Sequence, residues 1–217
     1  MNHREIDETV QRYDARLDEF GESEQALGWG AKGRSNLRFH VLASRWNVAG
    51  SRVLDFGCGF GGFYDFLKRA GTPVSYVGID LNPRFIRIAQ QRHPEATFIV
   101  GSVDALAEAG PVDYIVSSGV FNHRLDDNMG FIESAFKAFD RFATRGFACN
   151  FLSDRVDYPL DYTFHASPEG MLALAYRYSR NVVLRNDYMP FEFTVFVDKA
   201  ASIDPALTVY EDYVRFV

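Results

Sequence analysis

The segment from Val53 to Gly62 carries the residues whose types and spacing most clearly suggest chemistry. It reads Val-Leu-Asp-Phe-Gly-Cys-Gly-Phe-Gly-Gly, an apolar strand that runs into Asp55 and then into glycines at 57, 59, 61 and 62. Its first, second and fourth glycines also satisfy the dinucleotide-binding pattern, which by itself is a weak signal. A carboxylate two residues before the first glycine would repel a pyrophosphate. It would instead favour a nucleoside cofactor that carries an amino group and a sulfonium.

This segment resembles the first motif of the class I S-adenosylmethionine-dependent methyltransferases. That motif reads acid-x-Gly-x-Gly-x-Gly and is matched by Asp55, Gly57, Gly59 and Gly61. In the family a second strand ends in an acid that binds both ribose hydroxyls, and here Asp80 follows Gly57 at roughly the 20-residue spacing that a strand, a helix and a return strand require. The resemblance covers residues 50 to 151 well and the whole chain more distantly. It implies S-adenosylmethionine as cofactor and S-adenosylhomocysteine as product.

The resemblance also implies which residues hold the cofactor. A third strand leads into Gly101, and most relatives carry an acid directly after this glycine where they contact adenine. Ser102 stands there instead, so Asp104 or the Val103 backbone is the predicted adenine contact. Arg38 is placed on the methionine carboxylate, because arginine binds carboxylates in bidentate fashion. The predicted cofactor-binding residues are Arg38, Asp55, Gly57, Gly59, Gly61, Asp80, Leu81, Ser102, Val103, Asp104 and Ser118.

The loops after the fourth, fifth and sixth strands supply candidates for the acceptor site. His123 beside Asn122 is the first candidate for a general base, because histidine titrates near neutral pH. The alternative is a surface histidine that begins a polar run. His165 is a second candidate. Asp187 beside Tyr188 could orient a base or bind a sugar hydroxyl, although an aspartate in a hairpin turn also serves turn geometry. The predicted catalytic residues are His123, Asn122, Asp187 and Tyr188.

A narrower resemblance is to a bacterial subgroup of small methyltransferases of unassigned substrate, near the trans-aconitate and sugar methyltransferases. The stretches that carry it are 27–32, 38–39, 118–122, 150–153 and 187–195. It implies that Trp29 and Lys32 lie in a cap above the cofactor, with ordinary core packing as the alternative for Trp29. Most of the aromatic residues follow core periodicity. Four of them are reserved for a substrate role: Phe121, Tyr158, Tyr162 and Tyr188.

The elements that must position these residues follow from periodicity. Apolar residues from Ile6 to Phe20 recur at helical spacing, and a second helical stretch runs to about Trp46. Beyond residue 51, strands and helices alternate, which is typical of a parallel sheet with helices on both faces. The last two strands are separated by about five residues, so they form a hairpin. The predicted strands are 52–56, 75–79, 97–100, 112–117, 146–152, 181–186 and 192–197, and the predicted helices include 60–70, 83–92 and one that spans 131–139.

These elements predict one α/β domain over residues 1–217. Its core is a Rossmann-like, seven-stranded, mostly parallel sheet with a C-terminal antiparallel hairpin strand and helices on both faces. We expect residues 1–50 to form a helical N-terminal cap, residues 51–199 the core sheet and residues 200–217 a tail. A chain of 217 residues is long enough to bury a full core.

Composition and charge limit the classes of substrate and binding partner that the sequence predicts. The net charge of −6 argues against a nucleic-acid substrate, which draws on clustered Lys and Arg. The cluster Arg84, Arg87 and Arg92 has a solvated helix face as its ordinary explanation. No apolar run is long enough to cross a bilayer and the N-terminus lacks a signal-peptide core, so a cytoplasmic protein with reduced Cys58 and Cys149 is expected. The five histidines lack metal-ligand spacing. A small-molecule substrate and a monomer or homodimer are expected.

The function predicted from these residues is methyl transfer from S-adenosylmethionine to a small polar acceptor, as O-methylation of a sugar or carboxylate metabolite. The alternative is a protein that binds S-adenosylmethionine or S-adenosylhomocysteine without transferase activity. A nicotinamide oxidoreductase is a third alternative, and Asp55 counts against it. For a hydroxyl acceptor, the reaction needs close alignment of the two reactants and removal of the acceptor's proton.

Overall fold

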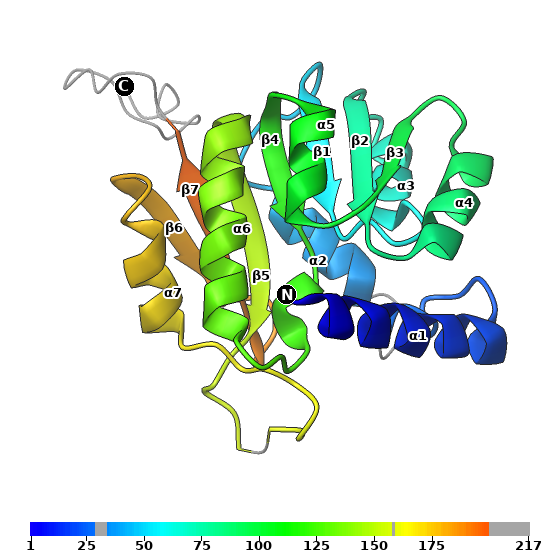
Figure 1. Ribbon diagram of the computed structural model, residues 1–217. Helices are drawn as coiled ribbons and strands as arrows, with labels where there is room; N and C mark the ends of the chain where they lie inside the picture. Colours follow the sequence, from blue (N-terminus) through cyan, green and yellow to red (C-terminus); the bar gives the residue numbers. More distant parts are fainter. Residues whose placement is uncertain (29–33, 158, 200–217) are drawn as a thin grey trace.

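The computed structural model describes residues 1–28, 34–157 and 159–199, and its centre is one seven-stranded sheet (Figure 1). The strands are β1 (Arg52–Phe56), β2 (Ser75–Asp80), β3 (Thr97–Val100), β4 (Val112–Ser117), β5 (Ala143–Leu152), β6 (Asn181–Arg185) and β7 (Glu192–Asp198). Their order in the sheet is β3-β2-β1-β4-β5-β7-β6. β7 pairs antiparallel with both of its neighbours, and the other pairings are parallel. The predicted mostly parallel sheet with a reversed hairpin strand is therefore confirmed.

Helices cover both faces of the sheet because side chains of each strand alternate between two apolar cores. The helices are α1 (His3–Phe20), α2 (Arg34–Ala43), α3 (Gly62–Arg69), α4 (Pro83–Arg92), α5 (Leu106–Ala109), α6 (Asn128–Phe142) and α7 (Pro168–Ala175). On β1, Leu54 packs with one core and Val53 with the other. The first core includes residues of α5, α6 and α7, and the second includes residues of α2, α3 and α4.

The helix α1 lies across the edge of the sheet at which β1 to β4 end, at the bottom of Figure 1. A capping box between Asn2 and Glu5 fixes its start. Leu17 packs with Phe60 and Phe85 in a third small apolar cluster. The carboxylate of Asp14 accepts a hydrogen bond from Asn82, the residue that caps α4, at 2.8 Å. These contacts hold α1 against the edge of the sheet at which the parallel strands end.

Several boundaries differ from the predicted ones. α2 ends at Ala43, and β5 begins at Ala143, directly after α6. The helix α7 was not predicted; Ser167 caps it and Pro168 begins it, which are ordinary start signals. Trp29, Lys32, Tyr158 and the tail 200–217 lie outside the described residues. Within the described part of the chain, no helix is long and apolar enough to cross a membrane, and no group of His, Cys, Asp and Glu could hold a metal ion.

Candidate active site

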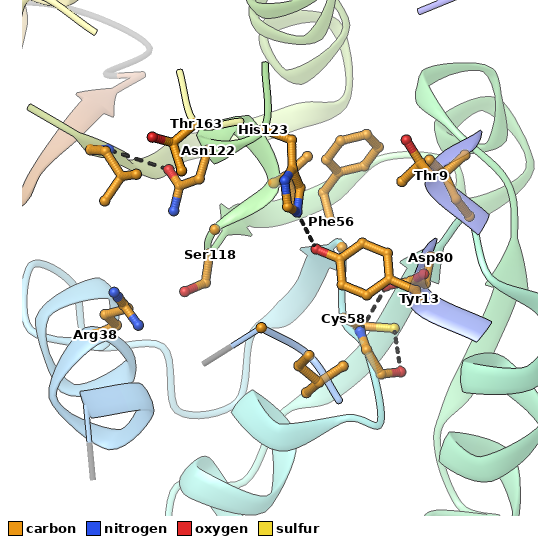
Figure 2. Close-up of a pocket in the computed structure, with 18 of the residues that line it drawn as sticks. Thr9, Tyr13, Arg38, Phe56, Cys58, Asp80, Ser118, Asn122, His123 and Thr163 are labelled. Carbon is orange, nitrogen blue, oxygen red and sulfur yellow. Dashed lines mark hydrogen bonds between the residues drawn. The ribbon is translucent and has the colours of Figure 1, made fainter. Parts of the chain in front are cut away.

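A cavity of about 810 Å³ opens at the carboxyl ends of the strands (Figure 2). This is the edge at which open parallel sheets bind ligands. Its size lies near the upper end of the roughly 300 to 1,000 Å³ common for ligand sites, so it can hold a nucleoside cofactor together with a small acceptor. Its walls come from α1, the start of α2, the glycine-rich turn after β1, and the segments that follow β2, β3, β4 and β5.

The glycine-rich turn after β1 is shaped by backbone contacts. The N–H groups of Gly57 and Cys58 both donate to the carbonyl of Ile79, at 2.7 and 3.0 Å. Gly57 has φ +82°, which L side chains rarely adopt, and a Cβ there would overlap the side chain of Val120. The turn must therefore be glycine at position 57. Its first two glycines, Gly57 and Gly59, line the cavity, whereas Gly61 precedes α3 and is not among the lining residues.

Asp80 closes the adjacent wall at the end of β2. One carboxylate oxygen accepts from the N–H of Gly59 and the other from the N–H of Asn82, each at 2.9 Å. Burial raises the pKa of Asp80, and these two backbone hydrogen bonds act against that shift. A carboxylate offers about four acceptor sites, so two remain for a pair of hydroxyls. Leu81 follows in the cavity wall.

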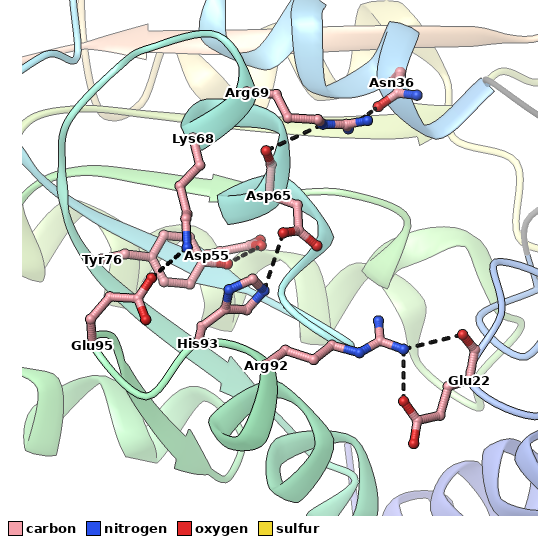
Figure 3. Close-up of polar contacts among 10 residues, drawn as sticks. All are labelled: Glu22, Asn36, Asp55, Asp65, Lys68, Arg69, Tyr76, Arg92, His93 and Glu95. Atoms are coloured by element: carbon pink, nitrogen blue, oxygen red, sulfur yellow. Dashed lines mark hydrogen bonds and ion pairs between the residues drawn. The ribbon is translucent and has the colours of Figure 1, made fainter.

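Asp55 is buried beneath the same turn, with 3% of its surface exposed. Its carboxylate accepts a hydrogen bond from the hydroxyl of Tyr76 at 2.7 Å, as Figure 3 shows. Burial raises the pKa of Asp55 to about 7, while the bond from Tyr76 lowers it. Asp55 touches the cavity, but near neutral pH it carries only part of a negative charge. Its negative charge is therefore smaller than that of the fully ionised carboxylate on which the exclusion of a pyrophosphate is based.

The predicted adenine contacts separate in the structure. Ser102 lines the cavity together with Gly101, but Val103 and Asp104, in the short 3-10 helix 103–105, are not among the lining residues. Of these three residues the cavity wall thus includes only Ser102, and the adenine contact itself stays a prediction. Ser118 does line the cavity, and its hydroxyl accepts from Asn150 at 3.1 Å.

Arg38 lines the cavity from α2, but its guanidinium already has a protein partner. Nε donates to Oε2 of Glu192 at 2.7 Å, and Nη2 contacts the second carboxylate oxygen of the same residue. Both side chains are buried, with 7% and 2% exposure. Burial lowers the pKa of Arg38 to about 10. Arg38 thus forms its bidentate contact with Glu192 of β7, whereas the sequence predicts this contact for the carboxylate of the cofactor.

His123 lies in the cavity wall after β4, where its imidazole meets α1. Nε2 and the hydroxyl of Tyr13 share a hydrogen bond of 2.8 Å (Figure 2). Burial, with help from Arg12 and Arg16, lowers the pKa of His123 to about 4, so the ring is neutral at neutral pH. Burial raises the pKa of Tyr13 to about 12. The cavity therefore contains a neutral imidazole in contact with a protonated phenol.

Three contacts fix the segment that carries His123. The amide of Asn128 donates to the carbonyl of His123 at 2.7 Å, and His123 forms an isolated bridge with Thr163. Asn122, also in the cavity wall, accepts from the N–H of Leu152 at 3.2 Å through its side-chain oxygen. Asn122 thus ties the segment after β4 to the end of β5 and helps to hold the neighbouring His123 in place.

Asp187 and Tyr188, in the link between β6 and β7, do not line the cavity. Asp187 pairs with Arg185 at 2.7 Å, its side chain 65% exposed, and the hydroxyl of Tyr188 shares a hydrogen bond of 2.9 Å with Thr194. Neither residue is among those lining the cavity, so their predicted role at the acceptor gains no support from the cavity and stays a prediction. The hairpin turn directs its first residues outward and contributes Pro190 and Phe191 instead.

The other predicted acceptor-side residues are His165, Phe121 and Tyr162, and two of the three line the cavity. His165 lines the cavity, but its two ring nitrogens are engaged by Thr163 at 2.9 Å and by the carbonyl of Ser153 at 2.7 Å. Phe121 is 1% exposed and stacks on Phe151, which makes it a core residue rather than a substrate contact. Tyr162 is in the cavity wall and 62% exposed.

Sequence reasoning missed several residues of the wall. Tyr13 lies within the helical pattern from Ile6 to Phe20, and that pattern gives no sign that its hydroxyl reaches His123. Further examples are Thr9, Arg34, Arg155, Val156, Asp157, Leu160, Pro190 and Phe191. No motif marks these positions. The one available signal is that they fall in the cap and in loops that follow strands, which is where α/β proteins place binding residues.

Comparison with known proteins gives a consistent result. A family model described as a methyltransferase domain matches residues 53–144. The chain is 35% identical over 160 residues to a Mycobacterium tuberculosis protein named methyltransferase Rv1506c, an overlap of 69% of this chain and 93% of that protein. It is 42% identical over 55 residues to a fatty-acid O-methyltransferase of Mycolicibacterium smegmatis, which covers 25% of this chain and 20% of that protein.

Solved structures show the same fold. Magnesium protoporphyrin IX methyltransferase from Synechocystis, crystallised with bound S-adenosylhomocysteine, superposes with a TM-score of 0.63 at 16% identity, over 89% of this chain and all of that one. A methyltransferase from Archaeoglobus fulgidus superposes with a TM-score of 0.61 at 13% identity, over 78% of this chain and 95% of that one.

Proposed function

The chain belongs to the class I S-adenosylmethionine-dependent methyltransferases, and from that membership we propose that it methylates an oxygen of a small acceptor. The observation that carries the proposal is the Tyr13–His123 pair in the wall of the cavity that Gly57 and Asp80 also line. Bound S-adenosylmethionine supplies an activated methyl group. The remaining work of the protein is to hold the two reactants in line and to remove a proton from the acceptor.

The cofactor end fits a nucleoside. Asp80 has acceptor sites left after its two backbone bonds, and these would bind the ribose hydroxyls. Gly57 and Gly59 line the cavity, and a Cβ added at either would run into Val120 or Leu27, so this wall consists of bare backbone. Ser102 is the proposed adenine-side contact, and Ser118 would face the reacting end. Arg38, held by Glu192 at the start of β7, would belong to the acceptor end.

The acceptor end favours a hydroxyl. A hydroxyl must lose a proton as its oxygen attacks the methyl carbon, and the Tyr13–His123 pair can take one proton: Tyr13 accepts it while passing its own to Nε2 of the neutral imidazole. The pKa of His123, lowered to about 4, keeps this imidazole uncharged at neutral pH, so a ring nitrogen has a lone pair for the proton. The low pKa also makes the ring a weak base, so proton transfer depends on close alignment with the acceptor. A carboxylate acceptor, as in the fatty-acid relative, is a second candidate and needs no proton removal.

Binding and transfer test this function separately. Calorimetry with S-adenosylhomocysteine should show binding to the wild type and a loss of at least about 30-fold for Asp80→Ala, since the hydrogen bonds to both hydroxyls go with the carboxylate. Transfer of labelled methyl from S-adenosylmethionine should then be measured across matched hydroxyl, carboxylate and amine compounds. Labelling confined to amines would refute O-methylation, and a failure to bind S-adenosylhomocysteine would refute the cofactor site.

A further inference from the structure

Two arginines of α2 face the cavity one helical turn apart. Arg34 and Arg38 stand at i and i+4, so they lie on one side of the helix, and both line the cavity. Their surroundings differ. The guanidinium of Arg38 is buried against Glu192, whereas that of Arg34 lies over the ring of Phe191, 5.3 Å from its centroid. Arg34 is exposed and reaches the cavity from its open side.

The local charge is not balanced. Both carboxylate oxygens of Glu192 are bound by the guanidinium of Arg38. Arg34 is close enough to add to the lowering of the pKa of Arg38, after the larger effect of burial. In the described ranges, Arg34 has no ion pair or hydrogen bond. Glu192 balances Arg38, so Arg34 adds a positive charge to this part of the wall. The loop after β5 contributes Arg155 and Asp157, whose charges are of opposite sign.

We propose that Arg34 binds a carboxylate of the methyl acceptor, with the Arg38–Glu192 pair as the fixed base of this subsite. The inference rests on the proposed function and deepens it, because it makes the acceptor an acid that also bears the reacting hydroxyl. The planar fork of a guanidinium matches a carboxylate in bidentate geometry. The guanidinium of Arg34 lies 5.3 Å from the centre of the Phe191 ring, a cation–π contact that uses none of its N–H donors.

The placement favours the acceptor over the cofactor as the source of the carboxylate. The cofactor end is built from Gly57, Gly59 and Asp80, which follow β1 and β2. β4 and β5 lie between β1 and β7 in the sheet, so this end is separated from the β6–β7 connection. Arg34 instead packs on that connection, which supplies Phe191 and Pro190. The nearby loop after β5 adds an apolar surface that suits the body of such an acid, through Val156, Leu160 and Tyr162.

Calorimetry on protein saturated with S-adenosylhomocysteine tests the subsite with simple acids in place of the acceptor. The probes are benzoate and decanoate, each compared with its neutral counterpart, benzyl alcohol or decan-1-ol. We expect at least one carboxylate to bind more tightly than its alcohol. Arg34→Gln should weaken carboxylate binding about fivefold and leave the alcohol and S-adenosylhomocysteine affinities within about twofold. Arg34→Lys should retain part of the carboxylate preference.

Arg87→Gln is the matched control, because Arg87 is an exposed arginine of α4 that is not among the cavity residues. It should leave all these affinities unchanged. Equal binding of acids and alcohols, or no effect of Arg34→Gln, would overturn the subsite while S-adenosylhomocysteine still binds. An Arg34→Gln variant that loses S-adenosylhomocysteine instead would assign Arg34 to the cofactor. Absence of S-adenosylhomocysteine binding by the wild type would remove the proposed function itself.

Discussion

The two ends of the cavity are built differently. The cofactor end consists of short segments that each follow a strand, and main-chain groups join them: Gly57 donates to Ile79, and Gly59 donates to the carboxylate of Asp80. The acceptor end is assembled from segments far apart in the chain, and side chains join them. Tyr13 meets His123 across 110 residues, and Arg38 meets Glu192 across 154.

Because of this difference, we expect substitutions at the two ends of the cavity to affect different steps. A site made by backbone geometry is sensitive to any side chain added at its glycines but tolerates variation around them. A site made by side-chain pairs can be altered one residue at a time without loss of the frame. We therefore expect substitutions at the cofactor end to abolish binding, and substitutions at the acceptor end to change turnover or specificity.

Gly57→Ala should have the largest effect. The new Cβ would overlap Val120, and alanine is strained at φ +82°. We expect S-adenosylhomocysteine affinity to fall by at least about 100-fold and the free energy of unfolding to fall by about 3 kcal/mol, measured by calorimetry and by urea unfolding.

Gly71→Ala is the matched control, because Gly71 also has a positive φ of +67° but nothing lies within 4 Å of its added Cβ. It should cost about 1 kcal/mol from strain and leave S-adenosylhomocysteine binding intact. The double variant Gly57→Ala/Val120→Ala should recover part of the stability. Equal effects of the two glycine variants on binding would show that the turn is not the cofactor site.

His123→Gln should lower kcat on a hydroxyl acceptor by about 100-fold while the affinity for S-adenosylhomocysteine stays within about twofold, since a general base contributes roughly that much. Tyr13→Phe should lower kcat by a similar factor, because the phenol is the group that takes the proton from the acceptor and passes its own to His123. The double variant should be no slower than His123→Gln alone, as residues that act as a unit are not additive. Full activity of His123→Gln on a hydroxyl would remove His123 from proton transfer.

The pH dependence of stability should also report His123. Its pKa is about 4 when folded and about 6.5 when unfolded, so between these values the unfolded chain binds more protons. Stability should therefore fall as the pH falls from about 6.5 to about 4, by about 2 kcal/mol once partial exposure is allowed for. Urea unfolding at several pH values should show this loss in the wild type and less of it in His123→Gln. Identical slopes in the two proteins would contradict a buried, neutral His123.

Asp187→Asn should have the smallest effect. Asp187 is exposed and pairs with Arg185 outside the cavity, and exposed pairs contribute little. We expect kcat, KM and S-adenosylhomocysteine affinity to change by less than about twofold in steady-state assays and calorimetry. A tenfold loss of turnover would return Asp187 to the acceptor site, against the position of its side chain.

Much of the fold could be predicted because its signals are local. The alternation of strands and helices from Arg52 onward, Pro83 at the start of α4 and the short β6–β7 link each depend on neighbouring residues. The helix α7 was missed because its 8 residues are too few to show a clear helical period, although Ser167 and Pro168 mark its start. The hairpin was predicted, but which of its residues turn toward the cavity depends on the turn geometry.

The positions of Asp55, Gly57 and Asp80 at one edge of the sheet could be predicted from the sequence alone, because each lies at or just beyond the end of a strand with a clear local signal. Only the tertiary structure decided that Arg38 is bound by Glu192 and that Tyr13 reaches His123. The reason is physical: a periodic pattern fixes which face of a helix is apolar, but the partner of a polar group on that face depends on how elements far apart in the chain pack together.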